Sequence, residues 1–215
     1  MLYAITDRRL YGSGEAERRA RLLQQTAVWA ANKVDFIQLR EKDLPAREQV
    51  ELARATMRVV QHASGGTRLL INGRPDVALA ADADGVHLPS GSDTLTLREV
   101  RSILSGRAKA PYISVSCHTL QEVEAAREQA ADCILFAPVF EKIVGDGPSQ
   151  QKAFSGSGLA MLKEACQVAG PVPVFALGGV TAENAALCLQ AGAAGIAAIR
   201  MVADPPSTWL HFTRQ

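Results

Sequence analysis

The sequence lacks most of the features that mark specialised protein classes. Its four cysteines form no CxxC pair, and its Lys and Arg residues (23) form no block and nearly balance Asp and Glu (22). The missing cysteine pairs argue against a zinc–thiolate site or a disulfide scaffold. The balanced charge argues against binding to nucleic acid or to an anionic membrane surface. We therefore expect a small-molecule partner.

Long apolar runs and a signal-peptide pattern are absent as well. No stretch approaches the roughly 20 apolar residues of a membrane span. Asp7, Arg8 and Arg9 follow an apolar run of five residues, a layout unlike that of a signal peptide. We expect a cytoplasmic protein with no membrane partner. The cysteines, expected as free and buried thiols, are Cys117, Cys133, Cys166 and Cys188.

The chain does contain a regular alternation of short apolar runs and longer amphipathic stretches. The apolar runs, each followed by turn or polar residues, cover 2–6, 36–40, 68–72, 85–88, 112–116, 133–137, 172–177 and 195–199. Stretches with the apolar spacing of helices include 15–32, 46–63, 119–130, 158–168 and 182–191. The runs lack period-two alternation, which is typical of parallel strands buried on both faces.

Eight strand–helix units in 215 residues predict an α/β protein, a (β/α)8 TIM barrel that forms a single domain over residues 1–215. A doubly wound sheet is the alternative, but the first run lacks the GxGxxG turn of that fold. Residues 141–157, rich in Gly, Ser and charge, would form an irregular sixth βα loop that could act as a lid. Whether the chain forms a homo-oligomer stays open.

Polar residues follow most of the predicted strands and are candidates for a binding site. In a TIM barrel the carboxyl ends of the strands meet at the catalytic face. The side chains expected there, with donors or charge suited to a phosphorylated substrate, are Gln38, Arg40, Glu41, Lys42, Asn72, His87, Ser116, His118 and Arg200. For Arg40 and Lys42 an ordinary charged loop is the alternative.

A glycine pair follows the seventh predicted strand. Gly178 and Gly179 precede a helix expected to begin near 181–182. Such a pair lets backbone N–H groups approach an anion, and the loops after strands 7 and 8 are the usual phosphate site of TIM barrels. We predict that a phosphate binds there and at the backbone of Ile199 and Arg200. A tight turn that needs positive φ is the alternative.

Seven short motifs occur in a fixed order along the chain. They are ITD at 5–7, QLREKD at 38–43, GVHL at 85–88, SxH at 116–118, PVF at 138–140, LGGVTAEN at 177–184 and AGAAGIAA at 191–198. Together they resemble the superfamily of thiamin phosphate synthases and thiazole tautomerases, over nearly the whole chain. The resemblance implies a barrel, a phosphorylated thiazole as partner and a role in thiamin biosynthesis.

The sequence departs from the synthase branch of this superfamily at three places. A synthase couples a pyrimidine diphosphate to the thiazole phosphate using magnesium. The resemblance implies Asn-Asp after strand 3, an Asp after strand 4 and a Thr-rich loop ending in Lys after strand 6. Here Gly73 follows Asn72, Asp93 is displaced by one position, and the loop after Phe140 reads EKIVGDG. The loss of one metal carboxylate and of the loop cation would weaken stabilisation of the departing pyrophosphate.

The same departures, with INGRPDVAL at 71–79 and HLPSGS at 87–92, resemble the tautomerase branch. That resemblance implies movement of a proton in a thiazole phosphate carboxylate, without a metal or other cofactor. Pro138 replaces the histidine that it implies after strand 6. The remaining candidates for the proton transfer are His118, then Lys42 and Glu41, and His87, for which a structural role is the alternative.

We therefore expect a metal-independent thiazole tautomerase, which is an isomerase. Two alternatives remain. One is a thiamin phosphate synthase, a transferase that would need magnesium. The other is a non-catalytic protein that binds thiazole phosphate or thiamin phosphate.

Overall fold

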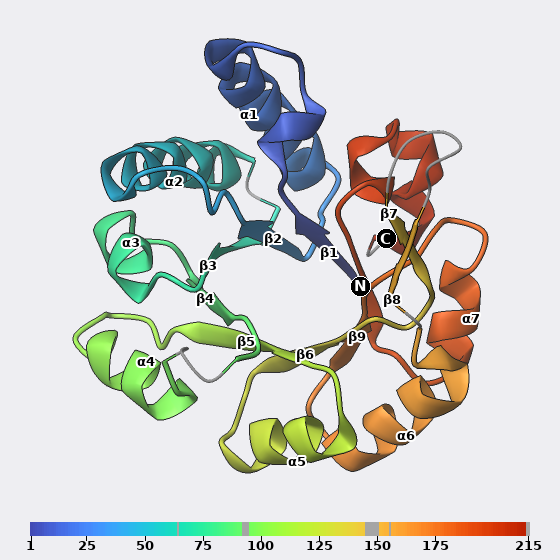
Figure 1. The fold of residues 1–215 in the computed structure, drawn as a ribbon. Helices are drawn as coiled ribbons and strands as arrows, with labels where there is room; N and C mark the ends of the chain where they lie inside the picture. Colours follow the sequence, from blue (N-terminus) through green and yellow to red (C-terminus); the bar gives the residue numbers. More distant parts are fainter. Residues whose placement is uncertain (64, 92–94, 145–150, 155, 214–215) are drawn as a thin grey trace.

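A closed barrel of eight parallel strands, in the order β1-β10-β9-β6-β5-β4-β3-β2, forms the centre of the computed structural model (Figure 1). The structure describes residues 1–63, 65–91, 95–144, 151–154 and 156–213. The barrel strands are β1 (Leu2–Ile5), β2 (Phe36–Leu39), β3 (Arg68–Asn72), β4 (Gly85–Leu88), β5 (Tyr112–Cys117), β6 (Cys133–Phe136), β9 (Val174–Ala176) and β10 (Gly195–Ala198). The predicted TIM barrel is confirmed, and pairing of β1 with β10 excludes an open doubly wound sheet.

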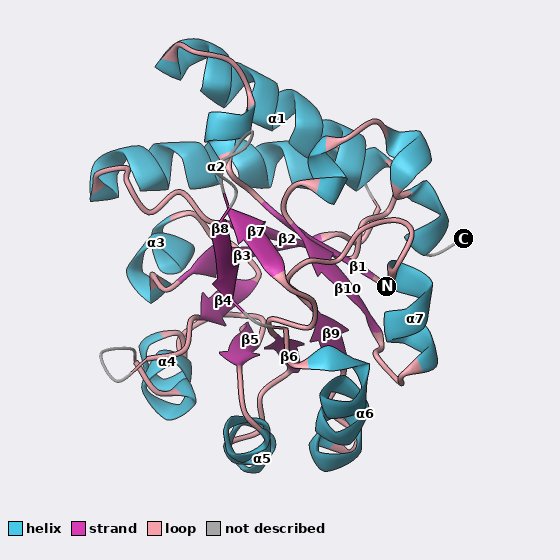
Figure 2. Ribbon diagram, turned by 45° about the vertical axis from the view of Figure 1, so that its right-hand side comes forward, coloured by secondary structure: helices cyan, strands magenta, loops and turns pink. Residues whose placement is uncertain are grey.

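Helices cover the outside of the barrel (Figures 1 and 2). They are α1 (Glu15–Ala31), α2 (Ala46–His62), α3 (Pro75–Ala80), α4 (Leu97–Ile103), α5 (Leu120–Glu128), α6 (Gly158–Ala169) and α7 (Ala185–Gln190). In α1, Leu22, Thr26 and Trp29 share one face of the helix by their spacing and are fully buried. Among the described residues, no helix combines the length and hydrophobicity that crossing a membrane requires.

A series of 3₁₀ turns follows the last barrel strand. The turns cover Met201–Ala203, Pro206–Thr208 and Leu210–Phe212. The indole Nε1 of Trp29 on α1 donates to the carbonyl of Val202 at 2.9 Å. This contact attaches the C-terminal segment to the first helix.

The segment after β6 differs from the prediction of an irregular loop over 141–157. It contains two short antiparallel strands, β7 (Lys142–Val144) and β8 (Gln151–Phe154). The prediction is wrong for these residues because backbone pairing between two short segments leaves no trace in a composition rich in Gly, Ser and charge. The lid role of this segment stays a prediction, and 145–150 lies outside the described residues.

The barrel interior is apolar toward the amino ends of the strands and polar toward their carboxyl ends. The rings of Tyr3 and Phe36 stack with centroids 5.4 Å apart, and Phe175 meets Phe36 edge to face at 5.7 Å. Nearer the carboxyl ends lie the buried polar side chains of Gln38 and His87. The aromatic cluster fills the barrel interior toward the amino ends of the strands, and the polar side chains lie toward the carboxyl ends.

The prediction of free thiols is also confirmed. All four cysteines are free, and Cys117, Cys133 and Cys188 are buried whereas Cys166 is half-buried. Burial raises the pKa of Cys117 and of Cys133 to about 12. These two thiols are therefore poor nucleophiles.

Candidate active site

Three polar side chains lie at the carboxyl ends of β2 and β3 without a protein partner. Arg40 and Lys42 follow β2, and Asn72 is the last residue of β3. None of the three side chains makes a hydrogen bond or an ion pair with a residue that the structure describes. Partial burial and the neighbouring Arg40 guanidinium lower the pKa of Lys42. Two unpaired cations beside a free amide suit an anion such as phosphate.

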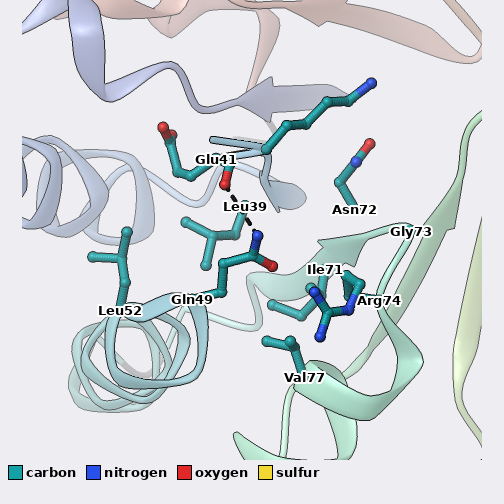
Figure 3. Close-up of a pocket in the computed structure, with 10 residues that line it drawn as sticks. Leu39, Glu41, Gln49, Leu52, Ile71, Asn72, Gly73, Arg74 and Val77 are labelled. Atoms are coloured by element: carbon teal, nitrogen blue, oxygen red, sulfur yellow. Dashed lines mark hydrogen bonds between the residues drawn. The ribbon is translucent and has the colours of Figure 1, made fainter. Parts of the chain in front are cut away.

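A pocket of about 230 Å³ lies beside these residues (Figure 3). Its lining combines apolar and polar side chains, namely Leu39, Leu52, Ile71, Val77, Gln49, Lys42, Asn72 and Arg74. In Figure 3, Leu52 and Gln49 on α2 face Ile71 and Arg74. The Gln49 amide donates to the carbonyl of Leu44 at 2.8 Å, which holds the loop after β2 against α2. The pocket therefore combines an apolar wall with the ammonium group of Lys42.

Glu41 is committed to a buried ion pair. Its carboxylate accepts hydrogen bonds from Thr6 Oγ1 at 2.6 Å and from Arg8 Nη1 at 3.0 Å. Burial raises the pKa of Glu41, and the hydrogen bonds from Thr6 and Arg8 oppose that effect. The ion-pair partner of Glu41 is Arg8 rather than the neighbouring Lys42. Glu41 ties the loop after β2 to the loop after β1, and these contacts occupy its carboxylate.

Gln38 and His87 lie inside the barrel, with 1% and 3% of their surface exposed. The His87 nitrogens contact Ser114 Oγ and Ser116 Oγ, each at 2.9 Å. Burial, with the nearby charges of Arg40 and Lys42, lowers the pKa of His87 to about 3. This geometry supports the structural alternative for His87. Ser116, half-buried near the end of β5, is the residue of this group that reaches the mouth.

His118 is exposed at the mouth, and its ring contacts residues that follow two other strands. Nδ1 lies within hydrogen-bonding distance of the carbonyl of Ala137, and Nε2 lies 2.7 Å from Ser90 Oγ. A carbonyl only accepts, so Nδ1 carries a proton, and in the neutral ring Nε2 accepts from Ser90. The imidazole can take up a proton at Nε2 from a substrate that displaces the Ser90 hydroxyl.

Thr119 caps α5. The Thr119 hydroxyl accepts from the backbone N–H of Glu122 at 3.2 Å, and the Glu122 carboxylate accepts from the N–H of Thr119. We expect Thr119→Ala to lower the free energy of unfolding by about 1 kcal/mol and the melting temperature by roughly 2–4 °C. Thr119→Ser keeps the hydroxyl and should melt with the parent protein. Equal melting temperatures for all three proteins would contradict this capping role.

The glycine pair forms a tight turn. Gly178 and Gly179 have φ of +90° and +66°. A Cβ at Gly178 would lie 2.7 Å from the Cα of Pro138, so a larger residue would collide with the loop after β6. The pair therefore forms a turn that needs positive φ, and the phosphate site there stays a prediction. The helix expected near 181–182 begins only at Ala185, so the pair does not lie at a helix N-terminus.

Backbone amides remain available around this turn. Those of Gly178, Gly179 and Val180 have no acceptor among the described residues, and the same holds for Ile199 and Arg200. The two groups follow β9 and β10, which are neighbours in the barrel. Their proximity suits the predicted phosphate site. The Arg200 side chain is exposed.

No cluster of carboxylates suited to magnesium occurs among the described residues of the mouth. Gly73 has no side chain and Glu41 is bound to Arg8. Among the described residues, no group of three His, Cys, Asp or Glu side chains could hold a metal ion. Asp93 lies outside the described residues. The described residues do not fit the magnesium ion of a synthase, and we assign no catalytic step to it.

Several partners of the candidate residues gave no sequence signal, because their contacts join distant parts of the chain. Tyr3 and Ser114 hydrogen-bond at 2.9 Å across 111 positions of sequence, and Arg8 meets Glu41 across 33 positions. One signal was available. Ser114 and Ser116 are polar residues at alternate positions of an apolar strand, which marks an inward-facing polar row.

Comparison with known proteins places these features in one family. The model of the family described as "Thiamine monophosphate synthase" matches residues 2–202. A protein of Geobacter sulfurreducens, provisionally named a thiamine-phosphate synthase, is 43% identical over 207 residues, covering 95% of this chain and 87% of that protein. The thiamine-phosphate synthase of Roseiflexus sp. strain RS-1 is 35% identical over 206 residues, covering 96% and 79%.

A solved structure agrees with the sequence comparisons. The thiamine phosphate pyrophosphorylase from Pyrococcus furiosus superposes with a TM-score of 0.74 at 28% identity, covering 93% of this chain and 85% of that one. These names point to synthases and give no specific support to the tautomerase branch. The chain belongs to the thiamine monophosphate synthase family, whose setting is thiamin biosynthesis.

Proposed function

We propose that the chain is a thiamin phosphate synthase, a transferase that joins a pyrimidine diphosphate to a thiazole phosphate and releases pyrophosphate. The observation that carries the proposal is the unpaired Arg40 and Lys42 beside Asn72 at the barrel mouth. The names of the relatives also favour this transferase over the tautomerase that the sequence motifs suggested.

Electrostatic stabilisation is the contribution that Arg40 and Lys42 can make. Negative charge builds up on the diphosphate as its bond to the pyrimidine carbon breaks and the thiazole nitrogen takes its place. Fixed cations at that position favour the transition state over the ground state. Glu41 does not compete for them, because it is bound to Arg8. The pocket in Figure 3 would hold the pyrimidine ring.

The thiazole phosphate would bind on the other side of the mouth. Free amides at Gly178, Gly179 and Val180 and at the neighbouring Ile199 and Arg200 can donate to three phosphate oxygens. This arrangement leaves the thiazole ring between the phosphate site and the cations. The two substrates would then approach each other above the polar interior of the barrel.

A thiazole tautomerase is the second candidate, and Gly73 favours it. The missing carboxylate removes a metal ligand that the resemblance implies for a synthase. In that case His118, whose Nε2 would accept from the substrate in place of Ser90, would move the proton. His118→Gln should then lower isomerase turnover by about 10² to 10⁴-fold, whereas transferase activity would stay within a few-fold of the parent.

The test is an incubation of the purified protein with two thiazole substrates. Thiazole phosphate is incubated with pyrimidine diphosphate, with and without magnesium, and thiazole phosphate carboxylate is incubated alone. Formation of thiamin phosphate in the first mixture supports the transferase. Isomerisation in the second, without thiamin phosphate in the first, supports the tautomerase, and binding without turnover in either supports a non-catalytic role.

Magnesium should not be needed to bind the thiazole phosphate. The proposed phosphate site consists of backbone amides, and the described mouth offers no oxygen cage of the kind that magnesium prefers. Calorimetric titration of thiazole phosphate should give the same affinity in EDTA and in excess magnesium. A large gain in affinity with magnesium would contradict a phosphate site made of amides.

A further inference from the structure

We infer that His87 is a positioning residue that turns the hydroxyl proton of Ser116 toward the barrel mouth, where it donates to a bound anion. The inference rests on the anion site of the proposed function. It identifies His87, inside the barrel, as the residue that controls whether Ser116 donates to that site. It follows from a chain of hydrogen bonds that runs through the interior and ends at Ser116.

The hydrogen-bond chain is continuous and crosses the barrel interior from one pair of adjacent strands, β1 and β2, to another, β4 and β5. Gln38 on β2 donates from Nε2 to the Tyr3 hydroxyl at 3.2 Å. The Tyr3 hydroxyl lies 2.9 Å from Ser114 Oγ, and Ser114 Oγ lies 2.9 Å from His87 Nδ1. His87 Nε2 then lies 2.9 Å from Ser116 Oγ. All of these residues except the last are buried, so no solvent competes for their donors.

Counting donors fixes the direction of the chain. The Tyr3 oxygen accepts from Gln38, so its own proton goes to Ser114. The proton of Ser114 then goes to His87 Nδ1, which must be an acceptor. The His87 proton therefore sits on Nε2 and is donated to Ser116 Oγ. The Ser116 proton has no acceptor among the described residues.

The neutral state of His87 makes this direction matter. Burial keeps the imidazole uncharged, so only one of its nitrogens carries a proton. With that proton on Nε2, Ser116 offers a donor at the mouth. With it on Nδ1, Ser116 would donate inward to Nε2 and present only lone pairs, which repel an anion. The Gln38 amide, at the far end of the hydrogen-bond chain, thus determines whether Ser116 presents a donor or only lone pairs at the mouth.

The tautomer can be measured directly in the unliganded protein. Nitrogen-15 NMR distinguishes a protonated from an unprotonated ring nitrogen, and the His87→Asn spectrum assigns the signals. We expect His87 to carry its proton on Nε2. In Tyr3→Phe, which cannot donate to Ser114, this preference should weaken. A proton on Nδ1 in the parent protein would overturn the inference, whatever substrate the protein uses.

A matched pair of variants tests the consequence for binding, with inorganic pyrophosphate as the probe. A Gln amide can reach the position of the imidazole Nε2 and donate to Ser116, whereas an Asn amide reaches only the position of Nδ1. We expect His87→Gln to bind pyrophosphate within a few-fold of the parent. His87→Asn and Ser116→Ala should each lose about ten-fold, as expected for one hydrogen bond to a charged group.

Three further outcomes separate the inference from the proposed function. If Lys42→Ala weakens pyrophosphate binding but Ser116→Ala does not, the Ser116 hydroxyl does not touch the anion and the inference is wrong. Equal losses of pyrophosphate affinity in His87→Gln and His87→Asn, with both variants folded by circular dichroism, would show that His87 acts through packing. That result would also overturn the inference. Failure of the parent to bind pyrophosphate would remove the proposed anion site, while the NMR result would still decide the tautomer.

Discussion

Replacing Lys42 with alanine is expected to lower kcat/KM for thiamin phosphate formation by about 100-fold or more. The ammonium group lies at the end of β2 with no partner among the described residues, and it lines the pocket of Figure 3. A cation that faces the leaving diphosphate stabilises charge that develops only in the transition state, and removing one such group costs about 10² to 10³-fold in rate. Steady-state kinetics with both substrates measures the change.

The matched control for Lys42 is Lys163. Its side chain is also exposed, but it lies on α6, a helix on the outside of the barrel, and not after a strand end. Lys163→Ala should keep the parent kcat/KM. Lys42→Arg keeps the charge and should recover part of the activity. If Lys42→Ala retained more than half of the parent activity, the diphosphate would be held elsewhere.

Acid should destabilise the parent protein more than it destabilises His87→Gln. The pKa of His87 is lowered to about 3 in the folded state, from an ordinary value near 6.5 in the unfolded chain. Between these values only the unfolded chain binds the proton, so stability is full above pH 6.5 and falls as the pH drops. From pH 7 to pH 4 the contribution of His87 alone is about 3 kcal/mol.

Urea unfolding at pH 7 and pH 4 measures this effect as a difference between proteins. The other titratable groups contribute equally in both proteins. The loss of unfolding free energy from pH 7 to pH 4 should therefore be about 3 kcal/mol smaller in His87→Gln than in the parent. His62→Gln, at an exposed position of α2, should keep the pH dependence of the parent. The same pH dependence in His87→Gln and the parent would mean that His87 is not held neutral.

The barrel could be predicted from the sequence because each of its strands is buried on both faces. Runs such as 133–137 and 195–199 therefore stand out as unbroken apolar segments. The hairpin of β7 and β8 could not be predicted, since each of its strands is only three or four residues long and no turn motif in the sequence marked their pairing. The start of α7 was misplaced because residues 181–184 form a turn before the helix at Ala185.

The residues of the candidate site that follow strand ends could be predicted from the sequence. The hydrogen-bond and ion-pair partners of these residues could not. Arg40, Lys42 and Asn72 were placed at the mouth by their positions after β2 and on β3. The role of Glu41 depends on Arg8, which no local pattern connects to it. His87 gave an ambiguous signal, because its burial and its two serine partners follow only from closure of the barrel.

The stoichiometry of pyrophosphate release tests the central claim most directly. Purified protein is mixed with thiazole phosphate and pyrimidine diphosphate in the presence of magnesium, and thiamin phosphate and pyrophosphate are quantified over time. The proposed transferase predicts one pyrophosphate for each thiamin phosphate, with both products lost together in Lys42→Ala. Absence of thiamin phosphate in that mixture, from a protein that isomerises thiazole phosphate carboxylate, would contradict it.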